Sequence, residues 1–320
     1  MITVLIAERV EETPDIARFV LRAPDGVALP AFTAGAHIDV EVSEGLMRQY
    51  SLCNDPVHRD HYEIAVLKDP ESRGGSVQIH DAFAIGDRIR ISEPRNMFEL
   101  KQTDAPVALF GGGIGITPMV AMAHTLHHTQ RQFEMHYCSR SADRMAMRRH
   151  LENSPFSEHV HLHFDDGGDE QRLQIAEVLQ AIGPDGHVYV CGPGGFIDWV
   201  CTSAKAAGFP DIQIHKEFFA VTADPLSGAD NGTFDVVIAS TGQVFSIGAK
   251  ETIIDVLEEN GIEILMSCQQ GICGSCITTV LEGDVVHHDQ VLTEEQKNEE
   301  NLFTPCCSRA AAGGKLVLNI

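Results

Sequence analysis

The stretch Cys268-Gln-Gln-Gly-Ile-Cys273-Gly-Ser-Cys276, followed much later by Cys306, decides how the rest of the chain is interpreted. The first three cysteines have the spacing C-x4-C-x2-C, and the fourth lies far downstream. This spacing is typical of the four thiolates that hold a 2Fe-2S cluster. The fourth thiolate can come from another element because the cluster bridges the two. The stretch therefore predicts a cluster-binding loop near the end of the chain.

Two glycines inside this stretch agree with that chemistry. A four-thiolate cluster must lie in a tight loop whose backbone N–H groups point at the sulfurs, and Gly271 and Gly274 can adopt the positive φ values that such a loop needs. Zinc is the competing interpretation, because four cysteines also suit a structural zinc site. Zinc sites usually pair their cysteines as two C-x2-C units, and this chain has only one such pair. An iron–sulfur cluster is therefore the favoured interpretation.

The adjacent Cys306 and Cys307 leave one ambiguity, since only one of them can be the fourth ligand. Residues 277 to 305 separate Cys276 from Cys306, and this length is the one found in plant-type ferredoxins, which the stretch resembles. The resemblance selects Cys306 as the fourth ligand. It leaves Cys307 as a buried packing thiol.

Length and charge limit the kinds of protein that this chain can be. At 320 residues it has room for two or three domains. Its apolar fraction of 43% and charged fraction of 22% are ordinary for globular proteins, so each domain can bury a core. The net charge of −23 argues against nucleic acid or an anionic membrane as a partner, because either would repel the protein. An acidic surface suits docking to a basic patch on another protein, and solubility alone explains it equally well.

Cysteine usage and the N-terminus indicate a reducing compartment. The nine cysteines are an odd number, and the chain opens with MITVLIAERV rather than with a secretory signal. The uncharged window 107–130 is interrupted by several glycines and by Pro118, so it fits strand, loop and helix better than a membrane span. We therefore expect a soluble, cytoplasmic protein that acts as a monomer.

Residues 1–102 have the pattern of a small antiparallel β-barrel, because short strand candidates such as HIDVEV and YEIAVL alternate with Gly and Pro turns. The segment RQYS at 48–51 joins a cation, an aromatic ring and a hydroxyl at a strand end. The segment RGGS at 73–76 offers backbone donors and a hydroxyl that suit a phosphate at a helix start. The alternatives are an ordinary amphipathic strand for the first segment and a plain turn for the second.

From residue 103 to 222 strands and helices alternate, which predicts an α/β domain with a parallel sheet. Residues 107–119 are an apolar strand, a glycine-rich loop and a helix start, with Thr117 as the expected N-cap and Pro118 at the first helical position. Such loops bind pyrophosphate through free N–H groups and the helix dipole, although the third glycine of G-x-G-x-x-G is missing here. A second glycine-rich strand exit, VCGPGG at 190–195, lies where parallel sheets bind ligands.

The last part of the chain is predicted to be a separate module. Residues 223–232 are rich in Pro, Gly and Asn and form the expected linker. Residues 233–320 contain the strand candidates FDVVIAS, QVFSI and LVLNI, the amphipathic helix TIIDVLEEN and the cysteine loop, which together indicate an α+β domain of the β-grasp type. The acidic run from Glu294 to Glu300 is expected to be a solvated helix face, with partner docking as the alternative.

Taken in order, these stretches resemble the phthalate dioxygenase reductase family of the ferredoxin–NADP reductase superfamily. RQYSLCN resembles its flavin-contacting strand, RGGS its FMN-phosphate loop, and GGGIGITPM its pyridine-nucleotide loop. VCGP resembles its nicotinamide-side loop, and SCQQGICGSC with PCCSRA resembles its C-terminal ferredoxin. The resemblance covers essentially the whole chain and extends to the reductase components of vanillate demethylase and related Rieske oxygenase systems. Of these motifs only the cysteines are decisive alone, but the ordered set is specific.

The resemblance implies binding roles for a set of residues. FMN, rather than FAD, would be held by Arg48, Tyr50, Ser51, Gly74, Gly75 and Ser76. The pyridine nucleotide would be held by Gly112, Gly113, Gly115, Thr117, Cys191, Gly192 and Pro193, with Thr117 approaching the flavin. Phe219 would cover the flavin ring, with Phe218 as the near alternative and a pair of core phenylalanines as the third possibility. The cluster ligands would be Cys268, Cys273, Cys276 and Cys306.

The nucleotide preference rests on the habit of the family. Some relatives place an acid where Ser141 stands, and an acid there would accept a hydrogen bond from the adenosine ribose and repel a 2′-phosphate. Ser141 beside Arg140 does neither strongly. The resemblance therefore favours NADH, with NADPH as the alternative.

The function implied by the resemblance is electron transfer from NAD(P)H through FMN to the 2Fe-2S cluster, and then to a terminal Rieske-type oxygenase that acts on an aromatic or similar small substrate. Orientation and tuning of cofactors suffice for this work, so no side chain is expected to be a general acid or base. The alternatives are a standalone flavin and iron–sulfur oxidoreductase with its own acceptor, and an iron–sulfur sensor or scaffold. The histidines are expected to be surface or packing residues, because no partner ligands accompany them: His124, His127, His128, His161 and His163.

Overall fold

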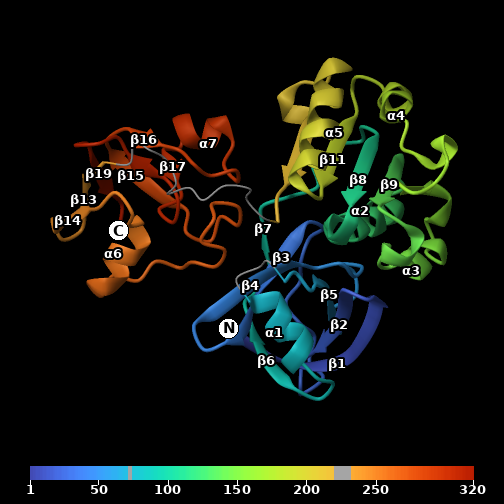
Figure 1. Ribbon diagram of the computed structural model, residues 1–320, viewed down its shortest axis with the longest axis horizontal. Helices are drawn as coiled ribbons and strands as arrows, with labels where there is room; N and C mark the ends of the chain where they lie inside the picture. Colours follow the sequence, from blue (N-terminus) through green and yellow to red (C-terminus); the bar gives the residue numbers. More distant parts are fainter. Residues whose placement is uncertain (71–73, 220–231) are drawn as a thin grey trace. The chain divides into compact units, whose positions relative to one another are not determined.

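The computed structural model describes residues 1–70, 74–219 and 232–320, and it divides into two compact units, 1–219 and 220–320. Figure 1 shows the course of the chain through its sheets and helices. The first unit contains two sheets, and the second unit contains a third together with a separate two-stranded pair. The predicted architecture of an antiparallel flavin domain, a parallel nucleotide domain and an α+β ferredoxin domain is thereby confirmed, while the predicted boundaries stay predictions. The expected linker at 223–232 lies almost entirely outside the described residues.

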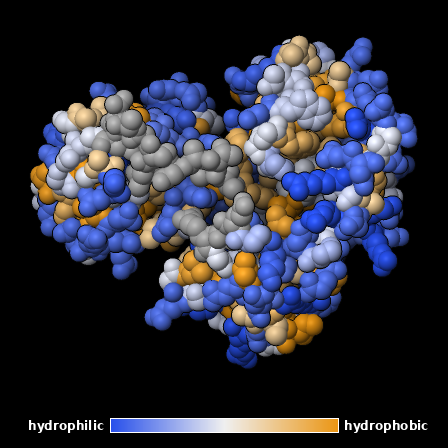
Figure 2. Space-filling model, in the orientation of Figure 1, coloured by the Kyte–Doolittle hydropathy of each residue, from blue (hydrophilic) through white to orange (hydrophobic). Residues whose placement is uncertain are grey.

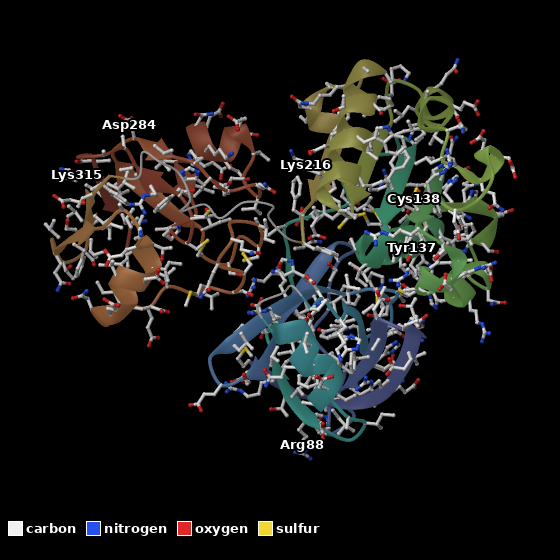
Figure 3. All side chains as sticks on the ribbon, in the orientation of Figure 1. Arg88, Tyr137, Cys138, Lys216, Asp284 and Lys315 are labelled. Atoms are coloured by element: carbon white, nitrogen blue, oxygen red, sulfur yellow. The ribbon has the colours of Figure 1, made fainter. Side chains whose placement is uncertain are left out.

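The first sheet is antiparallel and contains seven strands in the order β4-β3-β6-β1-β2-β5, with β7 paired to β3. Its strands alternate between core and solvent: in β6, Arg88 and Arg90 are exposed whereas Ile89 and Ile91 are buried. Figure 3 shows Arg88 on this strand. The strands are β1 (Ile2–Thr13), β2 (Ile16–Arg22), β3 (Ala36–Ser43), β4 (Leu46–Ser51), β5 (Tyr62–Leu67), β6 (Arg88–Ile91) and β7 (Arg95–Asn96).

The two end strands of this sheet, β4 and β5, follow one another in the chain and lie in contact. The sheet therefore curls round so that its edges approach, as the strand pattern predicts for a barrel. Helix α1 (Gly75–Ala82) packs against both of these strands. It begins immediately after Gly74, whose φ of 86° is left-handed. The predicted helix start at RGGS is thus confirmed, and Arg73 lies outside the described residues.

The second sheet is parallel throughout and has the order β10-β9-β8-β11-β12. Helices cover both of its faces, because the side chains of α2 pack into one core cluster and those of α4 and α5 into another. The strands are β8 (Val107–Gly112), β9 (Phe133–Ser139), β10 (Val160–Phe164), β11 (His187–Cys191) and β12 (Ile214–Glu217). The helices are α2 (Ile116–His128), α3 (Arg148–Glu152), α4 (Ile175–Ile182) and α5 (Gly194–Ala206). Single 3-10 turns lie at Gly113–Gly115, Ala142–Arg144, Ser157–His159, Asp169–Gln171 and Asp211–Gln213.

The expected cap of helix α2 is wrong by two residues. The helix begins at Ile116, its N-cap is Gly115, and no side chain caps it. Thr117 is the second helical residue, where its hydroxyl donates to the carbonyl of Ile114 at 3.1 Å. The 3-10 turn at Gly113–Gly115 starts the helix early, and Pro118 is tolerated because backbone N–H groups in the first turn have no helical partner.

One apolar core joins the two sheets of the first unit. It contains Cys53 and Ala65 from the β-barrel together with Met119 and Leu126 from α2 and Tyr189 from β11. Because core residues of both sheets pack together, residues 1–219 form one compact unit rather than two separate ones. Groups at the ends of strands in the two sheets are therefore held at fixed positions relative to one another.

The second unit is a mixed sheet with the order β14-β13-β19-β15-β17 and a short β16-β18 pair. Strands β13 and β19 are parallel and the other pairs are antiparallel. Thr252 caps helix α6 in a reciprocal hydrogen-bond pair with Asp255, which explains why the helix starts there. The elements are β13 (Phe234–Ile238), β14 (Val244–Ile247), α6 (Ile253–Glu259), β15 (Thr278–Glu282), β16 (Val285–Val286), α7 (Glu294–Asn298), β17 (Leu302–Phe303), β18 (Arg309–Ala310) and β19 (Lys315–Leu318).

The surface agrees with the composition. Hydrophilic residues cover much of the face seen in Figure 2, and Asp284 and Lys315 of the second unit are among the charged residues labelled in Figure 3. The acidic run beginning at Glu294 lies on and after α7 with its glutamates exposed, which confirms the predicted solvated helix face. Among the residues that the structure describes, none of the helices has the length and apolar character needed to cross a membrane.

Candidate functional site

The cysteine loop of the second unit brings its thiols together in pairs. Cys268 and Cys273 hydrogen-bond to each other, and Cys306 hydrogen-bonds to Cys276. The shared hydrogen bond raises the pKa of Cys268 and lowers that of Cys273. All four thiols are buried or half-buried in a chain segment that has no regular secondary structure around the first three. Two pairs of thiols are what a two-iron cluster requires, with one pair for each iron.

Backbone N–H groups of the loop point at these sulfurs. The N–H of Gln270 donates to Cys268 Sγ at 3.3 Å, and the N–H of Ser275 donates to Cys273 Sγ at 3.4 Å. Gly271 and Gly274 have φ values of 69° and 70°, which confirms their predicted left-handed conformation. The loop is therefore folded by its glycines into the shape that an anionic, sulfur-rich group needs.

Cys307 is buried beside the loop, as expected of a packing thiol. Its sulfur lies 3.1 Å from the hydroxyl of Thr304, and it also hydrogen-bonds to Cys306. A Cβ atom at Gly271 would lie only 2.4 Å from this sulfur, so the glycine is required by close packing as well as by its φ. These contacts give Cys307 partners within the protein, while the choice of Cys306 as the fourth ligand stays a prediction.

The predicted nucleotide loops meet at the carboxyl ends of β8 and β11. These strands are parallel neighbours, with Gly111 in register with Cys191. A Cβ atom at Gly115 would lie 2.3 Å from the Cys191 carbonyl oxygen, and one at Gly112 would lie 3.1 Å from Pro193 Cδ. The two glycine-rich segments, which follow β8 and β11, thus form one backbone surface with no room for side chains between them. We call this surface the nucleotide edge.

Cys191 takes part in this wall through its backbone. Its side chain is fully buried in the core that joins the two sheets, and burial raises the pKa of the thiol well above its ordinary value. A neutral, buried thiol isn't a nucleophile. This agrees with a packing role for Cys191.

The predicted flavin segments also lie together. The side chain of Arg48 on β4 covers the backbone of Gly75 at the start of α1, because a Cβ atom there would lie 2.6 Å from both Cγ and Nε of the arginine. The hydroxyl of Ser76 accepts a hydrogen bond from the N–H of Asp69 at 3.2 Å. A cation and the N-terminus of an eight-residue helix therefore occur at one place, which suits a phosphate group.

Sequence reasoning missed Glu217, the last residue of β12. Its side chain is half-buried, and its carboxyl accepts a hydrogen bond from the Ser51 hydroxyl of the β-barrel at 3.5 Å. Burial raises its pKa to about 8, so the carboxyl is mostly protonated at neutral pH. It ends the strand next to β11, in register with Cys191. Only its position before the two phenylalanines in HKEFF could have drawn attention to it.

Phe218 and Phe219 follow Glu217 and differ in environment. Phe218 packs on the core of the nucleotide sheet, with the Lys216 ammonium 5.4 Å above its ring. Lys216 is labelled in Figure 3. Phe219 is 38% exposed, so it isn't a core phenylalanine. Its exposed ring is accessible to a cofactor, and its role over the flavin stays a prediction.

The turn that follows β9 carries an acid that the sequence prediction did not use. The Ser141 hydroxyl donates to Asp143 Oδ1 at 2.5 Å, in the turn that follows β9. Figure 3 labels Tyr137 and Cys138 on the strand that leads to it. A carboxylate therefore lies beside the serine that replaces the expected acid.

The residues present fit the three groups that the resemblance implies. The cluster loop offers four thiols with N–H donors on the sulfurs. The nucleotide edge offers backbone N–H groups at a helix start where side chains are excluded. The β-barrel offers Arg48 beside the N-terminus of α1.

Comparisons with known protein families agree with two of these sites. A model of the 2Fe-2S iron–sulfur cluster binding domain matches residues 236–311. A model of the oxidoreductase NAD-binding domain matches residues 109–202.

Similarity to individual proteins covers the whole chain. Vanillate O-demethylase oxidoreductase of Pseudomonas sp. (strain HR199 / DSM 7063) is 47% identical over 310 residues, which are 97% of each chain. Tetrachlorobenzoquinone reductase of Sphingobium chlorophenolicum is 40% identical over 311 residues, 96% of this chain and 94% of that one. The solved structure of phthalate dioxygenase reductase, described as modular for electron transfer from pyridine nucleotides to [2Fe-2S], has a TM-score of 0.73 at 35% identity and covers 100% of this chain and 98% of its own.

Proposed function

This chain belongs to the phthalate dioxygenase reductase family and is an NAD(P)H-dependent flavin and 2Fe-2S oxidoreductase, and we propose that it uses FMN and NADH to reduce a terminal Rieske-type oxygenase that demethylates or hydroxylates a small aromatic compound. The observation that carries the proposal is the paired four-thiol loop in a chain whose other unit has a glycine-walled nucleotide edge. The relative at 47% identity is named for vanillate demethylation, which supports the aromatic substrate of the partner.

FMN is proposed because the residues at the phosphate end of the proposed flavin site suit one terminal phosphate. Arg48 and the N-terminus of α1 place positive charge and backbone N–H groups at one point, which suits a single terminal phosphate. When bound, a flavin accepts two electrons from a pyridine nucleotide and releases them one at a time. The residues that would hold the ring are Tyr50 and Ser51, at the end of β4, and the exposed Phe219.

NADH is proposed because of Asp143. A carboxylate beside Ser141 would accept hydrogen bonds from the ribose hydroxyls and repel a 2′-phosphate. The serine by itself offers no charge, so the acid two residues later takes over the role that a residue at 141 has in some relatives.

The partner is proposed from charge and surface. Leu265, which is 65% exposed, precedes the cluster loop by three residues, so an apolar contact lies close to the cysteines. Charged residues around such a contact steer an oppositely charged partner, and the net charge of −23 favours a basic one.

A second function is favoured by the relative named as a tetrachlorobenzoquinone reductase. In that case the chain would pass electrons to a small quinone and need no oxygenase. Steady-state oxidation of NADH separates the two. A rate that depends on an added oxygenase supports the reductase component, and an equal rate with a quinone alone supports the standalone enzyme.

The first test of the proposed function is an anaerobic absorbance titration of the purified protein with NADH and then with NADPH. We expect NADH to bleach both the flavin and the iron–sulfur bands at about one and a half equivalents, because the flavin takes two electrons and the cluster one, and we expect NADPH to act much more weakly. A flavin that bleaches beside an unresponsive cluster would contradict the proposed relay. A colourless protein that contains zinc would overturn the proposal.

A further inference from the structure

Asp55 of the β-barrel lies opposite two histidines of helix α2, apart from the cofactor sites. Its Oδ2 atom is 2.7 Å from His128 Nε2 and 3.6 Å from His124 Nδ1. The three ligand atoms all lie within 4.8 Å of one another. These are the nitrogen and oxygen donors that borderline divalent cations prefer.

The arrangement has a simple origin in the fold. His124 and His128 are four residues apart on α2, so their side chains project from the same face of the helix. Asp55 comes from the segment after β4, and the core shared by the two sheets holds that segment against the helix. The histidines taken from the sequence alone lacked a third ligand, and the tertiary structure supplies it.

Neighbouring groups orient the side chains of Asp55 and His124 for ligation. Asp55 Oδ1 accepts a hydrogen bond from the N–H of Val57 at 3.1 Å, which turns Oδ2 toward the histidines. The His124 ring is held edge-on to Phe156, with 4.9 Å between ring centroids.

We propose that Asp55, His124 and His128 bind one zinc ion that links the β-barrel to helix α2. In a tetrahedral site with metal–ligand bonds of about 2.0 to 2.1 Å, neighbouring ligand atoms are about 3.3 Å apart. The His124–Asp55 distance of 3.6 Å already suits this, and the 2.7 Å contact lengthens when the ion replaces the proton between His128 and Asp55.

The fourth position is open to solvent. The His128 side chain is 45% exposed and borders a hollow of about 520 Å³ that is also lined by His127 and Arg131, so the ion has a path of entry. His58 Nε2 lies 4.0 Å from Asp55 Oδ2, and its side chain is 63% exposed. The fourth ligand is therefore water or His58.

Zinc is favoured over harder cations by the donor set. Two imidazoles and one carboxylate suit zinc, whereas magnesium and calcium prefer oxygen ligands. Because one ligand comes from the segment after β4 of the β-barrel and the other two from helix α2, a bound ion would resist their separation. We therefore expect zinc to raise the melting temperature of this unit.

The test uses the full-length, tag-free protein with flavin and cluster intact, freed of loosely held metal by brief chelation. Equilibrium dialysis against Zn²⁺ with metal analysis measures stoichiometry and affinity. We expect one equivalent with a dissociation constant in the micromolar range or tighter. Asp55→Asn and His128→Ala should each weaken binding at least tenfold and abolish the zinc-dependent rise in melting temperature.

Two control variants use histidines outside the proposed site. His127→Ala removes the neighbouring histidine of α2, whose ring packs near Phe156. His161→Ala removes a histidine of the edge strand β10 that pairs with Glu134 of β9. Both should bind zinc as the wild type does. Unchanged affinity in Asp55→Asn and His128→Ala, loss of binding in a control, or no binding by the wild type below about 100 μM would each overturn the proposal.

Discussion

The cluster loop and the nucleotide edge solve the problem of holding a cofactor in opposite ways. The cluster loop presents side chains, four thiols within a segment whose backbone turns around them. The nucleotide edge presents backbone, because Gly112 and Gly115 leave no space for side chains against the neighbouring strand. Covalent ligation depends on the identity of a few atoms, whereas binding of a phosphate-rich nucleotide depends on access to N–H groups. Loss of a thiol should therefore impair the first region, and addition of a methyl group should impair the second.

The largest expected effect is at the cluster. Cys306→Ser should lose the iron and the visible absorbance of the cluster, because a serine hydroxyl is a poor replacement for a thiolate ligand. Reduction of the flavin by NADH should persist, since its proposed residues lie within 1–219. Iron analysis and an anaerobic titration measure both properties.

Cys307→Ser is the matched control for that change. Serine can keep the hydrogen bonds to Thr304 and Ser308, so the cluster should be retained. Loss of iron in Cys307→Ser with retention in Cys306→Ser would assign the fourth ligand to the other cysteine.

The next effect tests whether the nucleotide edge is truly made of backbone. In Gly115→Ala the new methyl group would meet the Cys191 carbonyl oxygen at 2.3 Å, so the loop must shift. Overpacking of this kind costs about 1 to 3 kcal/mol, and we expect KM for NADH to rise about tenfold to a hundredfold with the cluster spectrum unchanged. Steady-state kinetics with an artificial acceptor provide the measurement.

Gly195→Ala serves as the control for the nucleotide edge. A Cβ atom at Gly195 meets nothing within 4 Å, although the residue lies in the same glycine-rich segment. Its KM should stay within about twofold of the wild type, as for most surface substitutions. An equal rise in both variants would mean that close packing isn't what the glycines provide.

The smallest effect concerns Glu217, the titrating side chain at the nucleotide edge. Its pKa is raised by burial from 4.5 to about 8, so its contribution to stability is fully present below pH 4.5 and is lost progressively as the pH rises to about 8. Between pH 6 and pH 8 the wild type should lose about 2 kcal/mol through this group. Glu217→Gln should remove that part of the loss, which pH-dependent thermal unfolding can detect.

The exposed Glu177 of α4 offers a control, and Glu177→Gln should unfold with the pH dependence of the wild type. If Glu217→Gln unfolds with the same pH dependence as well, the carboxyl isn't held in its neutral form in the folded protein.

The sequence by itself determined the features whose physics is local. Spacing within nine residues placed three thiols in one loop, Gly271 and Gly274 had to turn left-handed there, and the alternation of strand and helix required a parallel sheet. Each of these depends on neighbours in the chain, so a single sequence carries the information. The cap of α2 was the exception, because the turn at Gly113–Gly115 competes with Thr117 to start the helix.

Only the tertiary structure decided which distant residues meet. Ser51 hydrogen-bonds to Glu217, and Gly115 packs against Cys191. Asp55 faces His124 and His128. These contacts form because one shared core fixes the two sheets of the first unit and helix α2 against each other. Such contacts depend on the order and register of strands, which no local pattern encodes, and burial then changes the chemistry of the groups it brings together. That packing raises the pKa of Glu217, and it brings the His124 and His128 rings to Asp55.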